Sequence, residues 1–315
     1  MQWFAQAPSN IALIKYMGKK DTQNNIPIND SLSYTLKHLL TSVTLETQSG
    51  TQDIWEPLEL PGAISFALSR SDQKRFLNHL YYLKSIYNYT GGFIVRSVNN
   101  FPKSSGFASS ASSFAALTQC AILALSALTD QPLPSIDQQA SWSRLGSGSS
   151  CRSFYTPWAL WQDTTVTAIT LPYIELLHQA VIVSHNEKQI SSTQAHSLIK
   201  TSPHYIGRSE RANQRLKLLL QALQVELWAE AYNIIWDEFQ DMHHLFATCS
   251  DPFTYTTADG LRLLQQLQEI WDKQGDGPLI TMDAGPNIHL LYRPNQVELA
   301  QQIKCDYLLG NFDVV

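Results

Sequence analysis

Residues 99–113 read NNFPKSSGFASSASS and follow a predicted strand at residues 93–98. The segment holds one lysine and one glycine among many serines, and an apolar helix is predicted from about residue 109 to residue 128. The first N–H groups of a helix have no partner within it and lie at the positive end of its dipole. Because small residues let the backbone approach a bound group, the segment predicts a phosphate-binding loop. A serine-rich loop with ordinary helix caps is the alternative.

A second glycine-containing loop also suits an anion. Residues 144–153 read RLGSGSSCRS, and two glycines let this backbone approach a ligand closely. Arg152 offers a planar fork that matches a carboxylate or a phosphate. The adjacent Cys151 is expected to be a buried structural thiol, although a reactive thiolate beside an arginine is the alternative.

Two further segments add a basic and an acidic group. Residues 10–20 read NIALIKYMGKK and deliver Tyr16 and Lys19 at the end of an apolar strand, where a solvated basic turn is the alternative. Residues 281–287 read TMDAGPN, and Asp283 is an isolated acid that serves either as a base or as a turn cap. Anion-binding loops, cations and one acid together suit phosphoryl transfer.

Composition limits the class of protein. The chain has 315 residues, 22 lysines and arginines against 27 acidic residues, and a net charge of −5, which disfavours binding to nucleic acid by phosphate neutralisation. No apolar run is expected to cross a bilayer, because the most apolar stretch, 114–128, contains polar breaks and is predicted to be a buried helix. The four cysteines have no metal-binding spacing, and no signal peptide is visible. We expect a cytoplasmic protein with reduced thiols.

The order of elements favours an α+β fold. Apolar residues recur at helical spacing from Trp228 to Cys249, while 278–282 and 288–292 are predicted strands. Strands and helices do not alternate strictly, which disfavours a doubly wound sheet. The length predicts two packed units, and we place them at residues 1–182 and 183–315.

The loops resemble, in their order along the chain, the GHMP-type small-molecule kinases and, within them, the diphosphomevalonate decarboxylases. Residues 10–19 are similar to the family motif NIALIKYWGK, and residues 27–33 to P-x-N-x-S-x-S. Residues 99–116 resemble the NNFPTAAGLASSAS phosphate loop, 146–153 the GSGSACRS loop, and 281–287 the T-x-DAGPN segment.

The resemblance implies a two-domain α+β fold, with an N-terminal domain like ribosomal S5 domain 2 and a ferredoxin-like C-terminal domain. It implies that ATP and Mg²⁺ serve as cofactors in the decarboxylation of (R)-5-diphosphomevalonate to isopentenyl diphosphate, with ADP, phosphate and CO₂ as further products. The expected partner is this small molecule, with no nucleic acid and no membrane, and the family suggests a homodimer.

The resemblance also implies roles for individual residues. Asp283 would orient or deprotonate the substrate hydroxyl, and Arg152 and Asn10 would hold the substrate carboxylate. Lys15 is a further catalytic candidate, for which an inward-facing structural lysine is the alternative. The diphosphate is expected at Tyr16, Lys19, Ser147, Ser149 and Ser192. The ATP phosphates are expected at Lys103, Ser104, Ser105, Gly106, Ser109, Ser110 and Ser112, with Ser112 as a candidate Mg²⁺ ligand.

Departures from the family pattern leave the substrate open. The replaced positions are Met17 for Trp, Asp30 for Ser, 103–105 for Thr-Ala-Ala, 195–196 for Gly-Met and 242–243 for Ser-Asn. A monophosphate decarboxylase and a kinase that stops at the 3-phospho product are sibling alternatives. A non-catalytic sensor is disfavoured, because a binding module needs no isolated acid. His196, His243 and His244 could form a site together, but structural histidines are expected.

Overall fold

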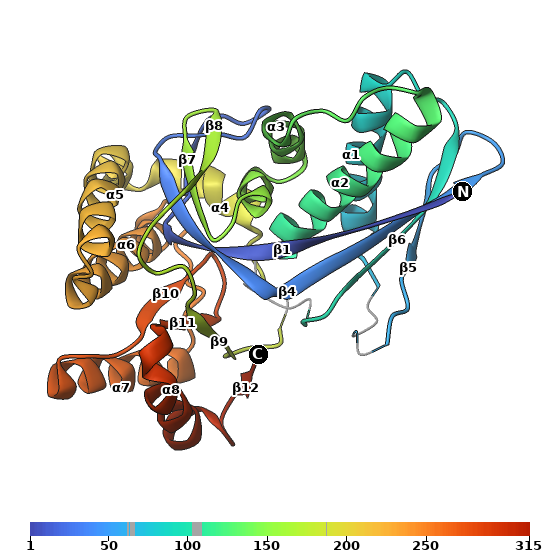
Figure 1. Ribbon diagram of the computed structural model, residues 1–315. Coiled ribbons are helices and arrows are strands. Elements are labelled where there is room, and N and C mark those ends of the chain that lie inside the picture. Colours follow the sequence, from blue (N-terminus) through green and yellow to red (C-terminus); the bar gives the residue numbers. More distant parts are fainter. Residues whose placement is uncertain (62, 64–66, 103–108, 187) are drawn as a thin grey trace.

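The chain is built on two main sheets (Figure 1). The structure is a computed structural model that describes residues 1–315 apart from 62, 64–66, 103–108 and 187. The larger sheet has the order β5-β6-β4-β7-β8, with β1 paired to β4. Its strands are β1 (Gln2–Ile14), β4 (Ser31–Gln48), β5 (Ile54–Pro57), β6 (Gly92–Asn99), β7 (Trp158–Gln162) and β8 (Thr165–Ile169).

The long strands β1 and β4 connect the two ends of this sheet. One end of β4 pairs with β7 at residues 31–34, and the other end pairs with β6 at residues 41–48. The register between β1 and β4 shifts after Pro8, which opposes Leu40, whereas Ser9 opposes Leu36. The apolar strand expected before Tyr16 is the end of β1, a 13-residue strand that stops at Ile14.

Three helices pack on the larger sheet: α1 (Arg70–Ile86), α2 (Ser109–Thr129) and α3 (Ile136–Gly146). The apolar helix predicted at 109–128 is confirmed as α2. Among the described residues α2 alone is long and apolar enough to span a membrane, yet 72% of its most apolar window is buried, as in a core helix. Ser135 caps the start of α3, because its Oγ accepts a bond from the N–H of Gln138 at 3.2 Å.

The smaller sheet has the order β10-β11-β9-β12. It contains β9 (Leu177–Ile182), β10 (Leu279–Met282), β11 (Ile288–Tyr292) and β12 (Asp313–Val314), and a two-stranded ribbon pairs β2 (Lys19–Asp21) with β3 (Ile26–Pro27). The helices of this half are α4 (Ser192–Leu198), α5 (Arg208–Gln224), α6 (Trp228–Thr248), α7 (Ala258–Gln274) and α8 (Val297–Ile303). The mixed order of elements confirms the α+β class.

One apolar core crosses between the sheets. It joins Ile11 and Trp158 of the larger sheet to Ile280 and Leu290 of the smaller one. A second core lies beneath α1 and α2. Because β9 pairs within the smaller sheet, sheet membership favours a boundary before residue 177, and the division after residue 182 stays a prediction.

Candidate active site

An acid and a lysine from opposite ends of the chain meet at the junction of the two sheets. Asp283 follows β10 and Lys15 follows β1, and Lys15 Nζ lies 2.8 Å from Asp283 Oδ1. Lys15 is 1% exposed, whereas the Asp283 side chain is 23% exposed and accessible from the site. Burial opposes ionisation of Asp283, but the charge and hydrogen bond of Lys15, together with the charges of His289 and Arg152, outweigh it and hold the pKa of Asp283 below its usual value. Asp283 is therefore ionised at neutral pH.

Lys15 is itself held by the backbone and by a buried acid. Its Nζ donates to the carbonyl of Ala12 at 2.6 Å, and its backbone N–H donates to Glu238 Oε1 at 3.0 Å. Burial lowers the pKa of Lys15, while Asp283 opposes that effect. Lys15 therefore faces inward and touches the acid, and its catalytic role stays a prediction.

Glu238 belongs to a buried network that sequence reasoning missed. Arg208 pairs with Glu238 and Asp241, and both Arg208 and Glu238 side chains are 0% exposed. Arg211 and Arg215 complete the network around Asp241. The signal was present, since Glu238 falls on the apolar face of α6, where a charged residue requires a partner.

Arg152 is fixed on the larger-sheet side of the site. Its Nε donates to Asn10 Oδ1 at 3.1 Å and its Nη1 to Ser31 Oγ at 2.9 Å. Asn10 Nδ2 in turn donates to the carbonyl of Ser149 at 3.2 Å and to Ser153 Oγ at 2.8 Å. Because these two partners are neutral, they orient the guanidinium without neutralising its positive charge. The charge stays available to bind a substrate carboxylate. Arg152 also contributes to the lowered pKa of Asp283.

Tyr16 and Lys19 line the adjoining region. The Tyr16 ring lies 4.7 Å from both the Trp161 and the His196 rings. A Cβ on Gly148 would lie 2.5 Å from Tyr16 Oη, so only glycine lets this loop approach the tyrosine. Lys19 Nζ donates to Asn25 Oδ1 at 2.6 Å, a neutral partner that leaves its charge available.

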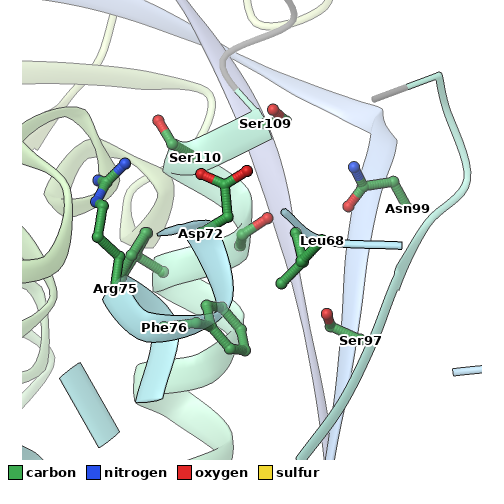
Figure 2. A pocket seen from close by; sticks show the side chains of 10 residues that line it. Leu68, Asp72, Arg75, Phe76, Ser97, Asn99, Ser109 and Ser110 are labelled. Carbon is green, nitrogen blue, oxygen red and sulfur yellow. The ribbon is translucent and has the colours of Figure 1, made fainter. Parts of the chain in front are cut away.

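The two predicted anion loops are in contact. Ser147 Oγ donates to Ser110 Oγ at 3.2 Å, which joins the second loop to the first turn of α2. Ser109 and Ser110 line a cavity of about 90 Å³ between α1 and α2 (Figure 2). Its other lining residues are Leu68, Asp72, Arg75, Phe76, Ser97, Asn99, Ser113 and Phe114.

Other predicted nucleotide-binding residues differ in how they are placed. Ser112 is fully buried and bonds Thr41 Oγ1 at 2.7 Å, so its hydroxyl faces the sheet, and the Mg²⁺ role stays a prediction that this geometry does not favour. The residues Lys103, Ser104, Ser105 and Gly106 lie outside the described part of the chain. Ser192 is exposed at the start of α4.

The residues that depart from the family pattern each contact a different set of neighbours. Asp30 Oδ2 accepts a bond from Gln162 Nε2 at 3.0 Å, and Met17 packs in an apolar cluster. His243 Nε2 bonds the carbonyl of Asp283 at 3.2 Å, whereas the ring of His244 packs against that of His204, tilted by 57°. Because His196 packs on Tyr16 instead, the three histidines do not form one site. Cys151 is buried, with its pKa raised to about 12 by burial, which confirms the structural thiol.

Family models match both halves of the chain. Residues 7–169 match the diphosphomevalonate decarboxylase-like N-terminal domain, and residues 180–311 match the mevalonate 5-diphosphate decarboxylase C-terminal domain. The diphosphomevalonate decarboxylase of Saccharomyces cerevisiae is 29% identical over 91% of this chain and 76% of its own.

Solved structures agree with these matches. The crystal structure of a mevalonate diphosphate decarboxylase from Legionella pneumophila is 61% identical, has a TM-score of 0.95 and is covered over 100% of both chains. The enzyme from Staphylococcus aureus is 28% identical with a TM-score of 0.85, covering 100% of this chain and 94% of its own. A complex of MDDEF with MVAPP, AMPPCP and magnesium is 27% identical with a TM-score of 0.86, covering 100% of this chain and 96% of its own.

The fold and the site together define a two-domain enzyme of the GHMP type, in which an acid that follows β10 pairs with a lysine that follows β1 at the junction of the two sheets. Both halves of the chain match the same family in order. The chain belongs to the diphosphomevalonate decarboxylase family.

Proposed function

We propose that this chain catalyses the ATP-dependent decarboxylation of (R)-5-diphosphomevalonate to isopentenyl diphosphate, with release of ADP, phosphate and CO₂, as a step of isoprenoid biosynthesis. The observation that carries the proposal is the ionised Asp283 beside Lys15, facing the same junction as the uncancelled charge of Arg152. The 61% identity to the Legionella pneumophila enzyme over the whole chain supports the same reaction.

The residues suit a reaction that builds positive charge at a tertiary carbon. A tertiary hydroxyl leaves poorly until it is phosphorylated, so Asp283 orients that hydroxyl and accepts its proton. Once that proton has passed to solvent, the Asp283 carboxylate also favours the cation that develops as the phosphate departs. Arg152, positioned by Asn10, holds the carboxylate that leaves as CO₂.

The nucleotide is assigned to the cavity between α1 and α2. The hydroxyls of Ser109 and Ser110 line it at the start of α2, where the first N–H groups of a helix have no partner within that helix, a donor set that fits phosphate oxygens. Mg²⁺ bound with ATP neutralises phosphate charge. The related MDDEF complex with AMPPCP and magnesium supports both cofactors.

The diphosphate is assigned to Tyr16, Lys19 and the serine loop that contains Ser147 and Ser149. Ser192 is proposed at the substrate diphosphate or at the transferred phosphoryl group. We further propose a homodimer in the cytoplasm, for which the molar mass in solution is the direct test of the dimer.

The test is a coupled assay with (R)-5-diphosphomevalonate, ATP and Mg²⁺ that follows ADP and CO₂ in parallel. One CO₂ for each ADP is expected. ADP without CO₂ would identify a kinase that stops at the phosphorylated product, and turnover of only the monophosphate would identify the sibling decarboxylase. Asp283→Asn should abolish most turnover while substrate still binds, whereas Asp30→Asn, which faces Gln162, should retain it. Binding without any turnover in the unaltered chain would favour the sensor.

A further inference from the structure

His196 is fixed in one orientation beneath the predicted diphosphate site. It lies on α4, is 8% exposed and packs its ring 4.7 Å from the ring of Tyr16. The backbone N–H of Gly18 donates to His196 Nδ1 at 2.9 Å. Gly18 has a φ of +104°, and a Cβ there would lie 2.5 Å from Ile28 Cδ1, so the turn that presents this N–H requires glycine.

The bond from Gly18 determines where the imidazole carries its proton. A ring nitrogen that accepts a hydrogen bond is unprotonated, so the neutral ring carries its hydrogen on Nε2. Burial, together with the charges of Lys19 and Lys200, lowers the pKa of His196 to about 3, which keeps the ring neutral. His196 therefore presents a hydrogen-bond donor without a charge.

That donor is available to a ligand. Within the described residues no hydrogen bond is made by Nε2, and this atom is absent from the fully enclosed polar atoms that lack a partner. The atom therefore keeps some exposed surface, on a ring that packs against Tyr16 of the predicted diphosphate site. By contrast Nδ1 is fully used by Gly18, so the two nitrogens have separate tasks.

Positive charge gathers around this donor. Lys200 follows His196 by four residues on the continuation of α4, and it acts electrostatically on both His196 and Lys19. Burial and the charges of Arg75 and Lys200 lower the pKa of Lys19, whose own hydrogen bond goes to a neutral amide. Lys19 and Lys200 carry like charges that act on each other, and the hydrogen bond of Lys19 goes to an amide instead of an acid. Such a pair favours the binding of an anion that carries more than one negative charge.

We propose that His196 Nε2–H and the Lys200 ammonium bind the diphosphate of the substrate and set the preference for a diphosphate over a monophosphate. This assignment rests on the proposed function for the identity of the substrate. A neutral donor of fixed direction adds selectivity for an oxygen position, whereas Lys200 adds positive charge, which favours the more highly charged diphosphate over a monophosphate.

The experiment compares inorganic pyrophosphate and inorganic phosphate as probes of the full chain by calorimetry. His196→Asn retains an oxygen for the Gly18 N–H but loses the Nε2 donor, and Lys200→Met loses the charge. Each variant should bind pyrophosphate about tenfold more weakly, with a change of at most about twofold for phosphate. The matched controls are His244→Asn, which lies outside the site, and Lys217→Met on α5, and both should bind as the unaltered chain does.

A folded His196→Asn that keeps its pyrophosphate affinity would overturn the donor role and leave His196 as a support for Gly18. If that variant does not fold, nitrogen-15 spectra of the unaltered chain decide, because pyrophosphate should shift the Nε2–H resonance of His196, and an unmoved resonance overturns the assignment. Weakened pyrophosphate binding in a chain that does not decarboxylate would overturn the proposed function alone. An unchanged ratio of kcat/KM for the diphosphate over the monophosphate substrate in active His196→Asn would overturn the selectivity.

Discussion

Replacing Lys15 by methionine tests the electrostatic control of the acid. The change keeps an unbranched chain in the buried position and removes the ammonium 2.8 Å from Asp283 Oδ1. A hydrogen bond to a charged group contributes about 1.5–3 kcal/mol, so its loss favours the protonated carboxyl by about 10- to 100-fold at a given pH. Because burial raises the pKa of Asp283 and Lys15 is the strongest charge that lowers it, the pKa of Asp283 rises in the variant.

The assay is kcat/KM from the coupled release of ADP between about pH 5 and about pH 9. The base works only when ionised, so activity on the acid side should be lost at a higher pH in Lys15→Met and recovered as the pH rises. Lys84→Met is the control, because Lys84 and Asp53 form a buried pair of the same 2.8 Å length at the C-terminal end of α1. If kcat/KM is lost at the same acidic pH in Lys15→Met and in Lys84→Met, the role of Lys15 is refuted.

Three further outcomes are expected. Arg152→Lys should lower kcat/KM at least tenfold in steady-state assays, because an ammonium cannot bond Asn10 and Ser31 and bind a carboxylate at the same time. An unchanged kcat/KM would contradict the role assigned to Arg152. Gly148→Ala should raise KM for the diphosphate substrate, since its Cβ would displace the Tyr16 ring, and an unaltered KM would show that the ring is not needed there. Glu238→Gln should lose about 3–5 kcal/mol of unfolding free energy in urea, against under about 1 kcal/mol for the exposed Glu269→Gln; equal losses would contradict the buried network.

Local periodicity predicted the elements that carry a strong apolar pattern. The apolar spacing that begins at Trp228 identified α6, and the small and apolar residues after Ser109 identified α2. Both patterns could be recognised because each lies within a single helix and depends on no distant residue. The separate helix α1 was not predicted, since its mean character is polar and its buried apolar residues, Phe76, Leu80 and Leu83, are few. Propensity and pattern carry less information in such a helix.

The site was predictable in its residue types but not in its pairings. Asp283 and Arg152 were found from motif and chemistry, while the contact of Asp283 with Lys15 joins residues 268 positions apart. That contact depends on how two sheets pack, which no local pattern encodes. The tautomer of His196 likewise follows from one backbone N–H of a distant turn. The roles of the site residues stay predictions until they are measured.

The bond between Glu238 and the backbone of Lys15 constrains how this protein can change over generations. Arg208 and Glu238 are both enclosed, so altering either residue by itself leaves an unpaired charge in the interior. Replacing Glu238 would also release the main chain that carries Lys15. The two positions are therefore expected to be inherited as a unit: a lineage that replaces one must replace the other, or pass through a less stable intermediate protein.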